Sequence, residues 1–241
     1  MNPLTVDQAI GLARDVEGGM QGISGVDVVV APPSPFILPV AKVLDHVGLG
    51  GQDAWQGDTG PMTGGVSAGQ LKELGVTHVI IGHSERRSHA SETDAMIQKK
   101  LRSVLEHGLV AILCVGERER SLNNGFTIAG EELLRAIEGL PEDYLKNLVI
   151  AYEPVWAIST TPGAEPDTPE NASRAGAALR SVIAGLYSKE AVDSVRIIYG
   201  GSVNEKNIKG FLEEGGMQGV LVGGAGLDPE RFLQIIRHAI H

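Results

Sequence analysis

The sequence has little cysteine, few aromatic residues and no excess of basic residues, and these shortages exclude several classes of protein. A single cysteine, Cys114, leaves no intramolecular disulfide to form. Lysine and arginine number 20 against 30 acidic residues, for a formal net charge of −10, which argues against a nucleic-acid binder. Any anionic ligand must therefore be held by backbone N–H groups or by a few placed cations. Apolar runs such as Val26–Ala31 are too short to cross a bilayer, so no membrane partner is expected.

The remaining composition is typical of one globular domain. Of the 241 residues, 42% are hydrophobic and 21% are charged, and no linker or shift in composition divides the chain. We therefore predict a single domain over residues 1–241. The opening residues, MNPLTVDQAI, have neither the basic region nor the apolar region of a signal peptide. This pattern predicts a cytoplasmic location.

Short β-branched runs alternate with longer segments of helical period, which is typical of βα units around a parallel sheet. Seven strands are predicted, at Val26–Ala31, Leu49–Gln52, His78–Ile81, Val110–Cys114, Leu148–Tyr152, Val195–Tyr199 and Val220–Val222. A doubly wound open sheet would alternate in the same way, but no Gly-x-Gly-x-x-Gly turn follows the first strand. The fold class predicted is therefore an α/β TIM barrel.

Eight helices are predicted, which is one more than the number of strands. The first begins at Thr5, before any strand, and the others lie near Pro35–Val47, Ser67–Leu74, Glu92–His107, Ile128–Ile137, Pro169–Tyr187, Glu205–Glu213 and Pro229–Ala239. Capping patterns mark four of the starts: Thr5-x-x-Gln8, Ser67-x-x-Gln70, Ser91-x-x-Asp94 and Thr168-Pro169. The uneven count predicts an incomplete barrel whose missing strand would precede residue 1.

Polar residues follow two of the apolar strands directly. The run Val79–Ile81 ends in the cluster Gly82–Arg87, which contains His83, and the run ending at Tyr152 is followed by Glu153. In a barrel, the carboxyl ends of the strands carry the active site. A carboxylate there suits proton abstraction next to a carbonyl. The structural alternatives are a satisfied turn histidine for His83 and a capping or solvated carboxylate for Glu153.

Glycine pairs end the last two predicted strands, at Gly200-Gly201 and Gly223-Gly224. Loops after the last two strands of a barrel commonly bind phosphate through exposed backbone N–H groups. One glycine pair alone is weak support, because turns use glycine everywhere. Two pairs in the last two units favour a phosphate site.

Taken in order, the motifs resemble triosephosphate isomerase from one end of the chain to the other. The segments that carry the resemblance are Ala31–Pro33, Gly82–Arg87, Leu113–Glu117, Ala151–Ala157, Tyr199–Val203 and Leu221–Ala225, with Thr63 between Gly60 and Ser67. The resemblance implies interconversion of dihydroxyacetone phosphate and glyceraldehyde 3-phosphate through an enediolate, in glycolysis and gluconeogenesis. It implies no cofactor and no metal, a small triose phosphate as the partner, and a homodimer.

The resemblance also implies roles for particular residues. Glu153 matches the general base, His83 the neutral electrophile and Glu85 a third catalytic position; this family is a well-known case of pKa tuning, and the logic for the first two roles is taken from that known case. Phosphate-binding positions are matched by Ser159, Ser202, Gly223 and Gly224. Cys114 and Glu117 match supporting positions near the base.

The sequence departs from the family at three places. The family begins with a strand that ends in Asn-x-Lys-Met-Asn, and Met1-Asn2 matches only the tail of that motif. Either the start was assigned late or the chain naturally lacks the strand, and both explanations stay open. The loop Ser159–Asp167 is about three residues longer than the family lid. Gly65 replaces a glutamate near the tip of the loop that docks onto a second subunit.

The missing lysine matters for function, because it would offset the charge of the phosphate and of the enediolate oxygen. Loss of one such preorganised group lowers the rate on the order of 10²–10³-fold. Two functions are therefore open. The chain is either a weakened isomerase or a catalytically inactive barrel that binds sugar phosphates or is a fold remnant. Retention of Glu153 and His83 favours the isomerase.

Overall fold

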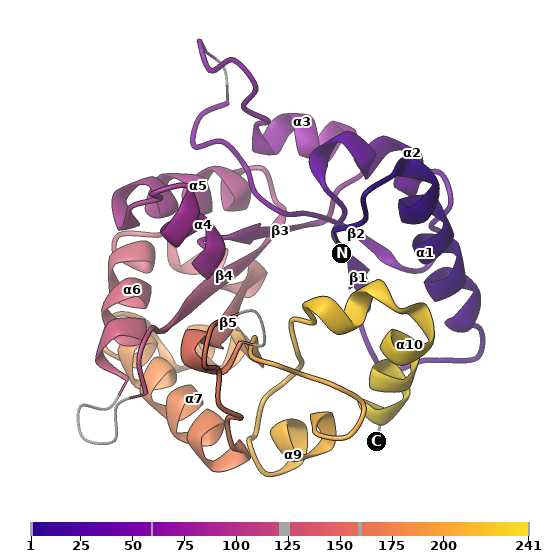
Figure 1. The fold of residues 1–241 in the computed structure, drawn as a ribbon. Helices are drawn as coiled ribbons and strands as arrows, with labels where there is room; N and C mark the ends of the chain where they lie inside the picture. Colours follow the sequence, from indigo (N-terminus) through magenta and orange to yellow (C-terminus); the bar gives the residue numbers. More distant parts are fainter. Residues whose placement is uncertain (1, 59, 121–125, 159–160, 241) are drawn as a thin grey trace.

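A computed structural model of the chain describes residues 2–58, 60–120, 126–158 and 161–240. Six parallel strands form one curled sheet in sequence order, and helices surround it as a ring (Figure 1). The strands are β1 (Val29–Val30), β2 (Gly48–Gly51), β3 (His78–Ile81), β4 (Val110–Glu117), β5 (Leu148–Pro154) and β6 (Arg196–Tyr199). The α/β barrel architecture predicted from the sequence is therefore present as a curled, parallel, open sheet.

The helices connect successive strands and lie outside the sheet. They are α1 (Val6–Gly19), α2 (Ile37–Ala41), α3 (Ala68–Glu73), α4 (Ser84–His89), α5 (Asp94–Glu106), α6 (Thr127–Ile137), α7 (Pro169–Ala184), α8 (Lys189–Ser194), α9 (Ile208–Glu213) and α10 (Pro229–His238). Short 3₁₀ turns occur at Ser34–Phe36, Glu142–Asn147, Val155–Ala157 and Gly224–Leu227. Within the described ranges, no helix is both long enough and apolar enough to cross a membrane.

The predicted count of seven strands and eight helices is not confirmed. The segment predicted as the seventh strand, Val220–Val222, makes one isolated parallel bridge, between Val220 and Tyr199, and all three of its residues are half-buried. Tyr199 exchanges backbone hydrogen bonds with Gly219 and Leu221, and in the described ranges no second bridge extends this pairing into a ladder. Helices α4 and α8 were not predicted, because their six residues, SERRSH and KEAVDS, carry few or no apolar side chains from which a helical period could be read.

The predicted helix starts are confirmed at three of the four capping patterns. The side chains of Thr5, Ser67 and Thr168 each accept a hydrogen bond from the backbone N–H three residues later, and Ser67 forms a full capping box with Gln70. The fourth start, at Ser91, is wrong. Ser91 has φ 54°, in the left-handed region, and Thr93 caps α5 by accepting from the N–H of Met96 at 3.3 Å.

The hydrophobic core is densest between the sheet and the helices. Strand residues that face the helices, such as Val79, Ile81 and Leu113, are 0% exposed. Residues that alternate with them and face the inside of the curled sheet, such as Ile80 and Ile112, are only half-buried. The packing therefore holds the strands in register from outside, while the inside is less completely filled.

Candidate active site

Glu153 lies at the carboxyl end of β5 and is almost completely buried, with 2% of the residue exposed. Its Oε2 accepts a hydrogen bond from the backbone N–H of Ser84 at 2.9 Å. Its Oε1 lies 3.0 Å from Nε2 of His83, but the angles do not make a hydrogen bond, so Oε1 is buried without such a partner among the described residues. A buried, unsatisfied carboxylate oxygen is rare in structural roles and common at catalytic sites.

His83 approaches Glu153 from the end of β3. Gly82, with φ 74°, turns the chain so that His83 becomes the N-cap of α4. The Nδ1 of His83 accepts a hydrogen bond from the N–H of Glu85 at 3.3 Å. An accepting Nδ1 places the ring proton on Nε2, the nitrogen that faces Glu153. The neutral imidazole therefore presents an N–H donor to the site.

Glu85, the third predicted catalytic residue, stands at the edge of this arrangement. Its side chain is 67% exposed, and its Oε2 is 3.9 Å from Nδ1 of His83. It therefore lies beside the imidazole ring, on the side opposite to the Nε2 that approaches Glu153. The structure brings all three predicted catalytic residues to one rim of the sheet, with Glu153 and His83 in direct contact.

Burial raises the pKa of the Glu153 carboxyl above its usual value of 4.5, and the nearby His83 and the N–H of Ser84 only partly oppose this effect. Burial also raises the pKa of the Cys114 thiol well above its usual value, and the adjacent Glu153 charge adds to this rise. Cys114 therefore remains a neutral thiol that can donate to Glu153. A carboxylate with a raised pKa is a stronger base than one in water.

Two glycines on the neighbouring strands make room for Glu153. The register pairs Gly116 of β4 with Glu153, and a Cβ at Gly116 would overlap the carbonyl oxygen of Glu153. On the other side, a Cβ at Gly200 would lie 3.0 Å from Cγ of Glu153. The sequence analysis assigned Gly200 only to phosphate binding and gave no role to Gly116. The role of Gly116 follows from the register of β4 against β5, which the sequence pattern does not give.

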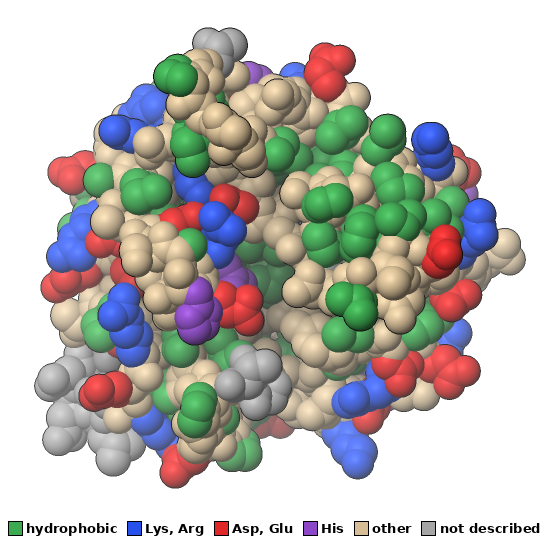
Figure 2. Space-filling model, turned by 45° about the horizontal axis from the view of Figure 1, so that its top comes forward, with side chains coloured by type: hydrophobic (Ala, Val, Ile, Leu, Met, Phe, Trp, Pro, Cys, Tyr) green, Lys and Arg blue, Asp and Glu red, His purple; other side chains and the backbone are tan. Residues whose placement is uncertain are grey.

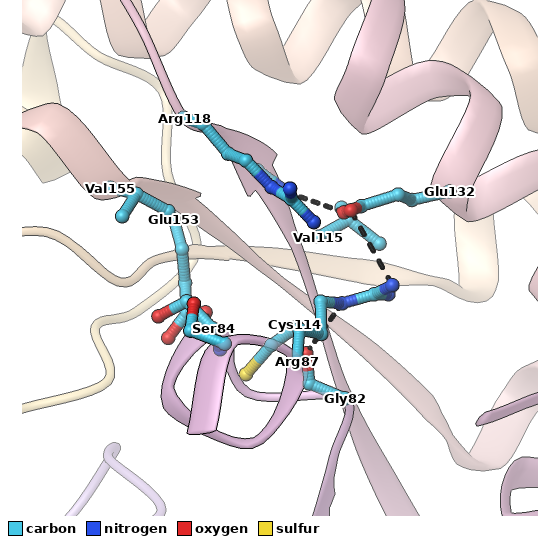
Figure 3. Close-up of a pocket in the computed structure, with 11 residues that line it drawn as sticks. Gly82, Ser84, Arg87, Cys114, Val115, Arg118, Glu132, Glu153 and Val155 are labelled. Carbon is cyan, nitrogen blue, oxygen red and sulfur yellow. Dashed lines mark hydrogen bonds and ion pairs between the residues drawn. The ribbon is translucent and has the colours of Figure 1, made fainter. Parts of the chain in front are cut away.

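Charged residues behind the site hold the turn that carries His83 (Figure 3). Arg87 donates to the carbonyl oxygen of Gly82 at 2.9 Å and to Asp94 at 2.7 Å, and its guanidinium also lies 3.4 Å from Glu132. Glu132 in turn accepts from the N–H of Gly116 at 3.1 Å. These contacts link β3, β4 and α6 around Glu153, and sequence reasoning did not identify them.

Glu117 supports a different element. Its Oε1 accepts from the N–H of Ala129 at 3.1 Å, in the first turn of α6, whose N-cap Phe126 has no capping side chain. Glu117 therefore caps α6 from the end of β4 and takes no direct part in the Glu153 contacts. This agrees with the supporting position that the resemblance implied.

The small cavity behind these residues is not the ligand site. It is lined by Glu153, Cys114, Ser84, Arg87 and Glu132, among others, and its volume is about 20 Å³ (Figure 3). That volume holds one water molecule and no three-carbon phosphate. The open side of the site is the rim, where Figure 2 shows a hollow near the middle of the face, with charged and histidine side chains on one wall and hydrophobic side chains on the other.

The predicted phosphate-binding residues lie beyond the neighbouring edge of the sheet. The bridge pairs Tyr199 with Val220, so Ser202 and Gly223 each follow a paired position by three residues. The Oγ of Ser202 is buried without a hydrogen bond in the part of the chain that the structure describes, and its carbonyl is fixed by Asn207 at 2.9 Å. A Cβ at Gly223 or Gly224 would meet no protein atom within 4 Å. Open space therefore faces both glycines.

The lengthened loop is partly described, and Ser159, predicted to bind phosphate, lies outside the described residues. After this gap, the N–H of Glu165 donates to the carbonyl oxygen of Trp156 at 3.2 Å. Arg120, from the chain after β4, ion-pairs with Glu165 at 3.0 Å and lies over the Trp156 ring at 5.1 Å from its centroid. The described end of the loop is therefore tied to its own start and to the segment after β4.

Comparisons with known proteins agree with this geometry. The triosephosphate isomerase family profile matches residues 1–239. Triosephosphate isomerase from Carboxydothermus hydrogenoformans is 40% identical over 237 residues, which cover 97% of this chain and 93% of that protein. The enzyme from Caldanaerobacter subterraneus is 41% identical over 97% of this chain and 91% of its own, and that from Symbiobacterium thermophilum is 42% identical over 89% and 84%. The chain belongs to the triosephosphate isomerase family.

Proposed function

We propose that the chain interconverts dihydroxyacetone phosphate and glyceraldehyde 3-phosphate, with Glu153 as the base that moves the proton. The observation that carries this assignment is the buried Glu153 carboxylate, whose Oε1 lies 3.0 Å from Nε2 of His83 and has no hydrogen bond within the described part of the chain. The reaction belongs to glycolysis and gluconeogenesis, as family membership implies. We place it in the cytoplasm, where these pathways run.

Glu153 and His83 divide the chemistry between them. Glu153 takes a proton from C1 of dihydroxyacetone phosphate, and the electron pair of the broken C–H bond moves into a C1–C2 double bond while the carbonyl oxygen gains negative charge. The Nε2–H of His83 donates to the developing oxygen and stabilises the enediolate. A proton then moves from the hydroxyl oxygen on C1 to the oxygen on C2. The protonated Glu153 returns its proton to C2 while the oxygen on C1 forms the aldehyde carbonyl, which gives glyceraldehyde 3-phosphate. No atom is gained or lost, and no cofactor is needed.

Ser202, Gly223 and Gly224 are proposed to hold the phosphate. The unpaired, buried Oγ of Ser202 provides one donor, and the open space at the two glycines leaves their N–H groups accessible to an oxygen of the ligand. Ser159 is proposed as a fourth phosphate contact on the basis of the family resemblance. The chain is acidic overall, so these local donors would do most of the binding.

Turnover is proposed to be low for the chain as it stands. The two arginines that follow His83 are both engaged elsewhere, Arg86 with Asp53 at 2.8 Å and Arg87 with Asp94 at 2.7 Å. Lys100, a buried lysine, is likewise held by Asp53. Because Arg86, Arg87 and Lys100 are held in these ion pairs, they do not help His83 to stabilise the negative charge on the enediolate oxygen. The same observation favours the second candidate, a barrel that binds sugar phosphates without turning them over.

The replacement of Glu153 by aspartate tests the assignment and separates the two candidates. Shortening the side chain by one methylene displaces the base by about 1 Å, which lowers kcat by about 10²-fold. Binding of a phosphoglycolate-type ligand, measured by calorimetry, should change far less. Equal losses in kcat and affinity would contradict the role of Glu153 as base. Ligand binding by the unaltered chain without any measurable turnover would establish the inactive barrel.

The oligomeric state is proposed to be a homodimer, formed through the loop between Trp55 and Ser67. This loop protrudes from the ring of helices (Figure 1), and Met62 within it is 52% exposed. The N–H of Trp55 donates to Val66 at 2.7 Å and closes the base of the loop. Sedimentation velocity of the chain and of Met62→Asp tests this proposal, since a charge in the contact should shift the protein to monomer. A monomer in both cases would contradict it.

A further inference from the structure

Glu132 is a buried carboxylate that the chemistry proposed above does not use. Its side chain is only 9% exposed, and the other buried residues of α6 are all apolar: Ala129, Leu133, Ala136 and Ile137. Burial raises the pKa of Glu132, and Arg87 and the N–H of Gly116 oppose this effect. An apolar side chain would fill the position at lower cost, because a buried charge is unfavourable unless partners compensate it. The role of Glu132 therefore lies in contacts that a carboxylate makes and an apolar side chain does not.

One oxygen of Glu132 holds the strand next to the base. Its Oε2 accepts a hydrogen bond from the N–H of Gly116 at 3.1 Å, and the register pairs Gly116 of β4 with Glu153 of β5. The two backbone segments are in close contact, because a Cβ at Gly116 would overlap the carbonyl oxygen of Glu153. A shift of Gly116 would therefore shift the backbone that carries the base.

The other oxygen of Glu132 holds the arginine that fixes the turn before His83. Oε1 of Glu132 lies 3.4 Å from Nη1 of Arg87, and Nε of Arg87 donates to the carbonyl oxygen of Gly82 at 2.9 Å (Figure 3). Gly82 directly precedes His83 in the chain. The side chain of Arg87 is 8% exposed, and its second anionic partner is Asp94, at 2.7 Å. Through Arg87, Glu132 is linked to the backbone that carries the electrophile.

A small cavity behind Glu153 leaves the packing of the base incomplete. Its volume is about 20 Å³, enough for one water molecule, and its lining includes Glu153, Cys114, Arg87 and Glu132. Nη2 of Arg87 is buried and has no hydrogen bond to the residues that the structure describes. The position of the base on this side therefore depends on hydrogen bonds and ion pairs more than on close contacts between side chains. Glu132 contributes to both arms of this support, at Gly116 and at Arg87.

We propose that Glu132 is a positioning residue for the isomerisation, an inference that rests on the proposed roles of Glu153 and His83. It acts through Gly116 and Arg87, and not on the substrate itself. Its two oxygens together set the 3.0 Å separation between Oε1 of Glu153 and Nε2 of His83. Displacement of a reacting group by about 1 Å lowers the rate by about 10²-fold. Substrate affinity is assigned to other loops and should depend little on Glu132.

Two substitutions at Glu132 test this proposal. Glu132→Gln keeps the shape and an oxygen that accepts from Gly116, whereas Glu132→Met keeps a similar volume and removes both contacts. Glu132→Met should lower kcat by about 10- to 100-fold with KM changed by less than about twofold, and Glu132→Gln should recover most of this loss. Glu190→Met, at an exposed position of α8, is the control and should match the unaltered chain. Equal kcat for Glu132→Met and the control would overturn the proposal.

A double variant separates positioning from stability. Removal of Glu132 alone takes one anionic partner from the buried Arg87 and destabilises the protein, whereas replacement of both members of a buried ion pair by apolar residues is often neutral. The double variant Arg87→Met, Glu132→Met also serves where Glu132→Met alone does not fold. Its kcat should stay at or below that of Glu132→Met whatever its Tm, because the contact with Gly82 is lost as well. A kcat that recovers to the unaltered value would make Glu132 a stabilising residue only and would overturn the proposal.

A measurement that needs no turnover distinguishes failure of this inference from failure of the proposed function. NMR of the isotope-labelled ring nitrogens of His83 reports the environment of Nε2, which faces Glu153. These signals should shift in Glu132→Met, return toward their original positions in Glu132→Gln and stay unchanged in Glu190→Met. Absence of turnover in the unaltered chain would contradict the proposed function alone. Ring signals of His83 that stay unchanged in Glu132→Met would overturn the positioning role, whether or not the chain turns over substrate.

Discussion

At the scale of residues, Glu153 combines near-complete burial with a carboxylate oxygen that has no hydrogen bond to any residue the structure describes. Such a group lowers the stability of the fold, because charging a buried carboxyl is unfavourable unless partners compensate. Ser84 and His83 compensate in part, and the pKa of Glu153 stays raised. The fold therefore accepts a cost in stability to keep a carboxylate at the rim, as the proposed role of Glu153 as the base requires.

The pH dependence of the free energy of unfolding detects this cost. The folded protein holds the Glu153 proton more tightly than the unfolded chain, whose value is 4.5, so the wild-type free energy of unfolding should fall as pH rises from 4.5 through the raised folded pKa. Glu153→Gln removes this titration. The variant should be more stable than wild type above that window and lose its advantage below pH 4.5. Urea unfolding from pH 4 to 8 measures the difference; Glu131→Gln on the exposed face of α6 is the control. A difference that does not vary with pH would contradict the burial argument.

Sequence reasoning placed His83 and Glu153 at the same rim, where the structure brings them within 3.0 Å, because the carboxyl ends of all strands in a curled parallel sheet lie at one rim. It did not show that Ser84 donates to Glu153 or that Gly116 makes room for it. Those contacts depend on the exact register of β4 against β5 and on the turn at Gly82. A hydrophobic pattern gives the existence of a strand but not its register. The supporting contacts could therefore not be read from the chain.

At the scale of elements, the turn at Gly223-Gly224 and the loop tied by Arg120 are tested by separate substitutions. The turn at Gly223-Gly224 has open space where a Cβ would be added, so Gly224→Val should leave the fold intact and crowd the ligand instead. We expect a KM and an inhibitor Kd raised about tenfold, with the Tm unchanged. Titration with inorganic phosphate and with a phosphoglycolate-type ligand measures this, and Gly226→Val in the same turn is the control. Unchanged affinity would mean that the glycines serve only the turn.

The loop tied by Arg120 gives a second test at this scale. Arg120 and Glu165 are 45% and 67% exposed, so their ion pair contributes only about 0.2–1 kcal/mol. Arg120→Ala should therefore speed proteolytic cleavage near Ala164 by roughly 1.5- to 5-fold, and a saturating phosphate ligand should slow cleavage in both proteins. Arg196→Ala, which breaks the exposed pair with Asp27 at the start of β6, is the control. Cleavage that is insensitive both to Arg120 and to ligand would exclude a role for this loop in ligand binding.

Local sequence patterns predicted the bounds of some helices and strands correctly and those of others incorrectly. The predicted bounds of β3 match because an apolar run lies between clear polar borders, and Thr5, Ser67 and Thr168 cap helices as predicted. Ser91 does not cap α5, because the side-chain oxygen of Thr93, two residues later, accepts from the N–H of Met96 and caps the helix instead. Val220–Val222 has the composition of a strand, yet among the described residues it makes one bridge, because composition does not determine how many residues pair with β6.

At the scale of the whole molecule, a large cavity inside the curled sheet, lined by Ile80, Ile112 and Ile198 among others, dominates the energetics. An enclosed, dry cavity of about 380 Å³ would cost about 9 kcal/mol at roughly 24 cal/mol per Å³, and this figure is an upper limit here because the cavity opens to solvent. Domains are stable by only about 5–15 kcal/mol. A chain with this cavity should therefore have modest stability and expose strand edges that favour self-association.

A pair of enlarging substitutions tests this view of the core. Ile112 faces the cavity and is half-buried, whereas its neighbour Leu113 faces the helices and is 0% exposed. Ile112→Phe should leave the Tm unchanged or raise it, because the ring enters empty space. Leu113→Phe should destabilise the protein by about 1–3 kcal/mol through overpacking. Thermal and urea unfolding compare the two, and equal destabilisation would show that the inside of the sheet is already filled.

Solvent deuterium exchange tests most directly whether Glu153 carries the proton. The chain is incubated with dihydroxyacetone phosphate in deuterated water, and NMR follows deuterium at C1 of the substrate and C2 of the product. Wild type should incorporate deuterium at both carbons, Glu153→Gln should lose incorporation by about 10²–10⁴-fold while still binding a phosphate ligand, and Glu131→Gln should match wild type. Incorporation by Glu153→Gln at the wild-type rate would contradict the assignment of Glu153 as the base.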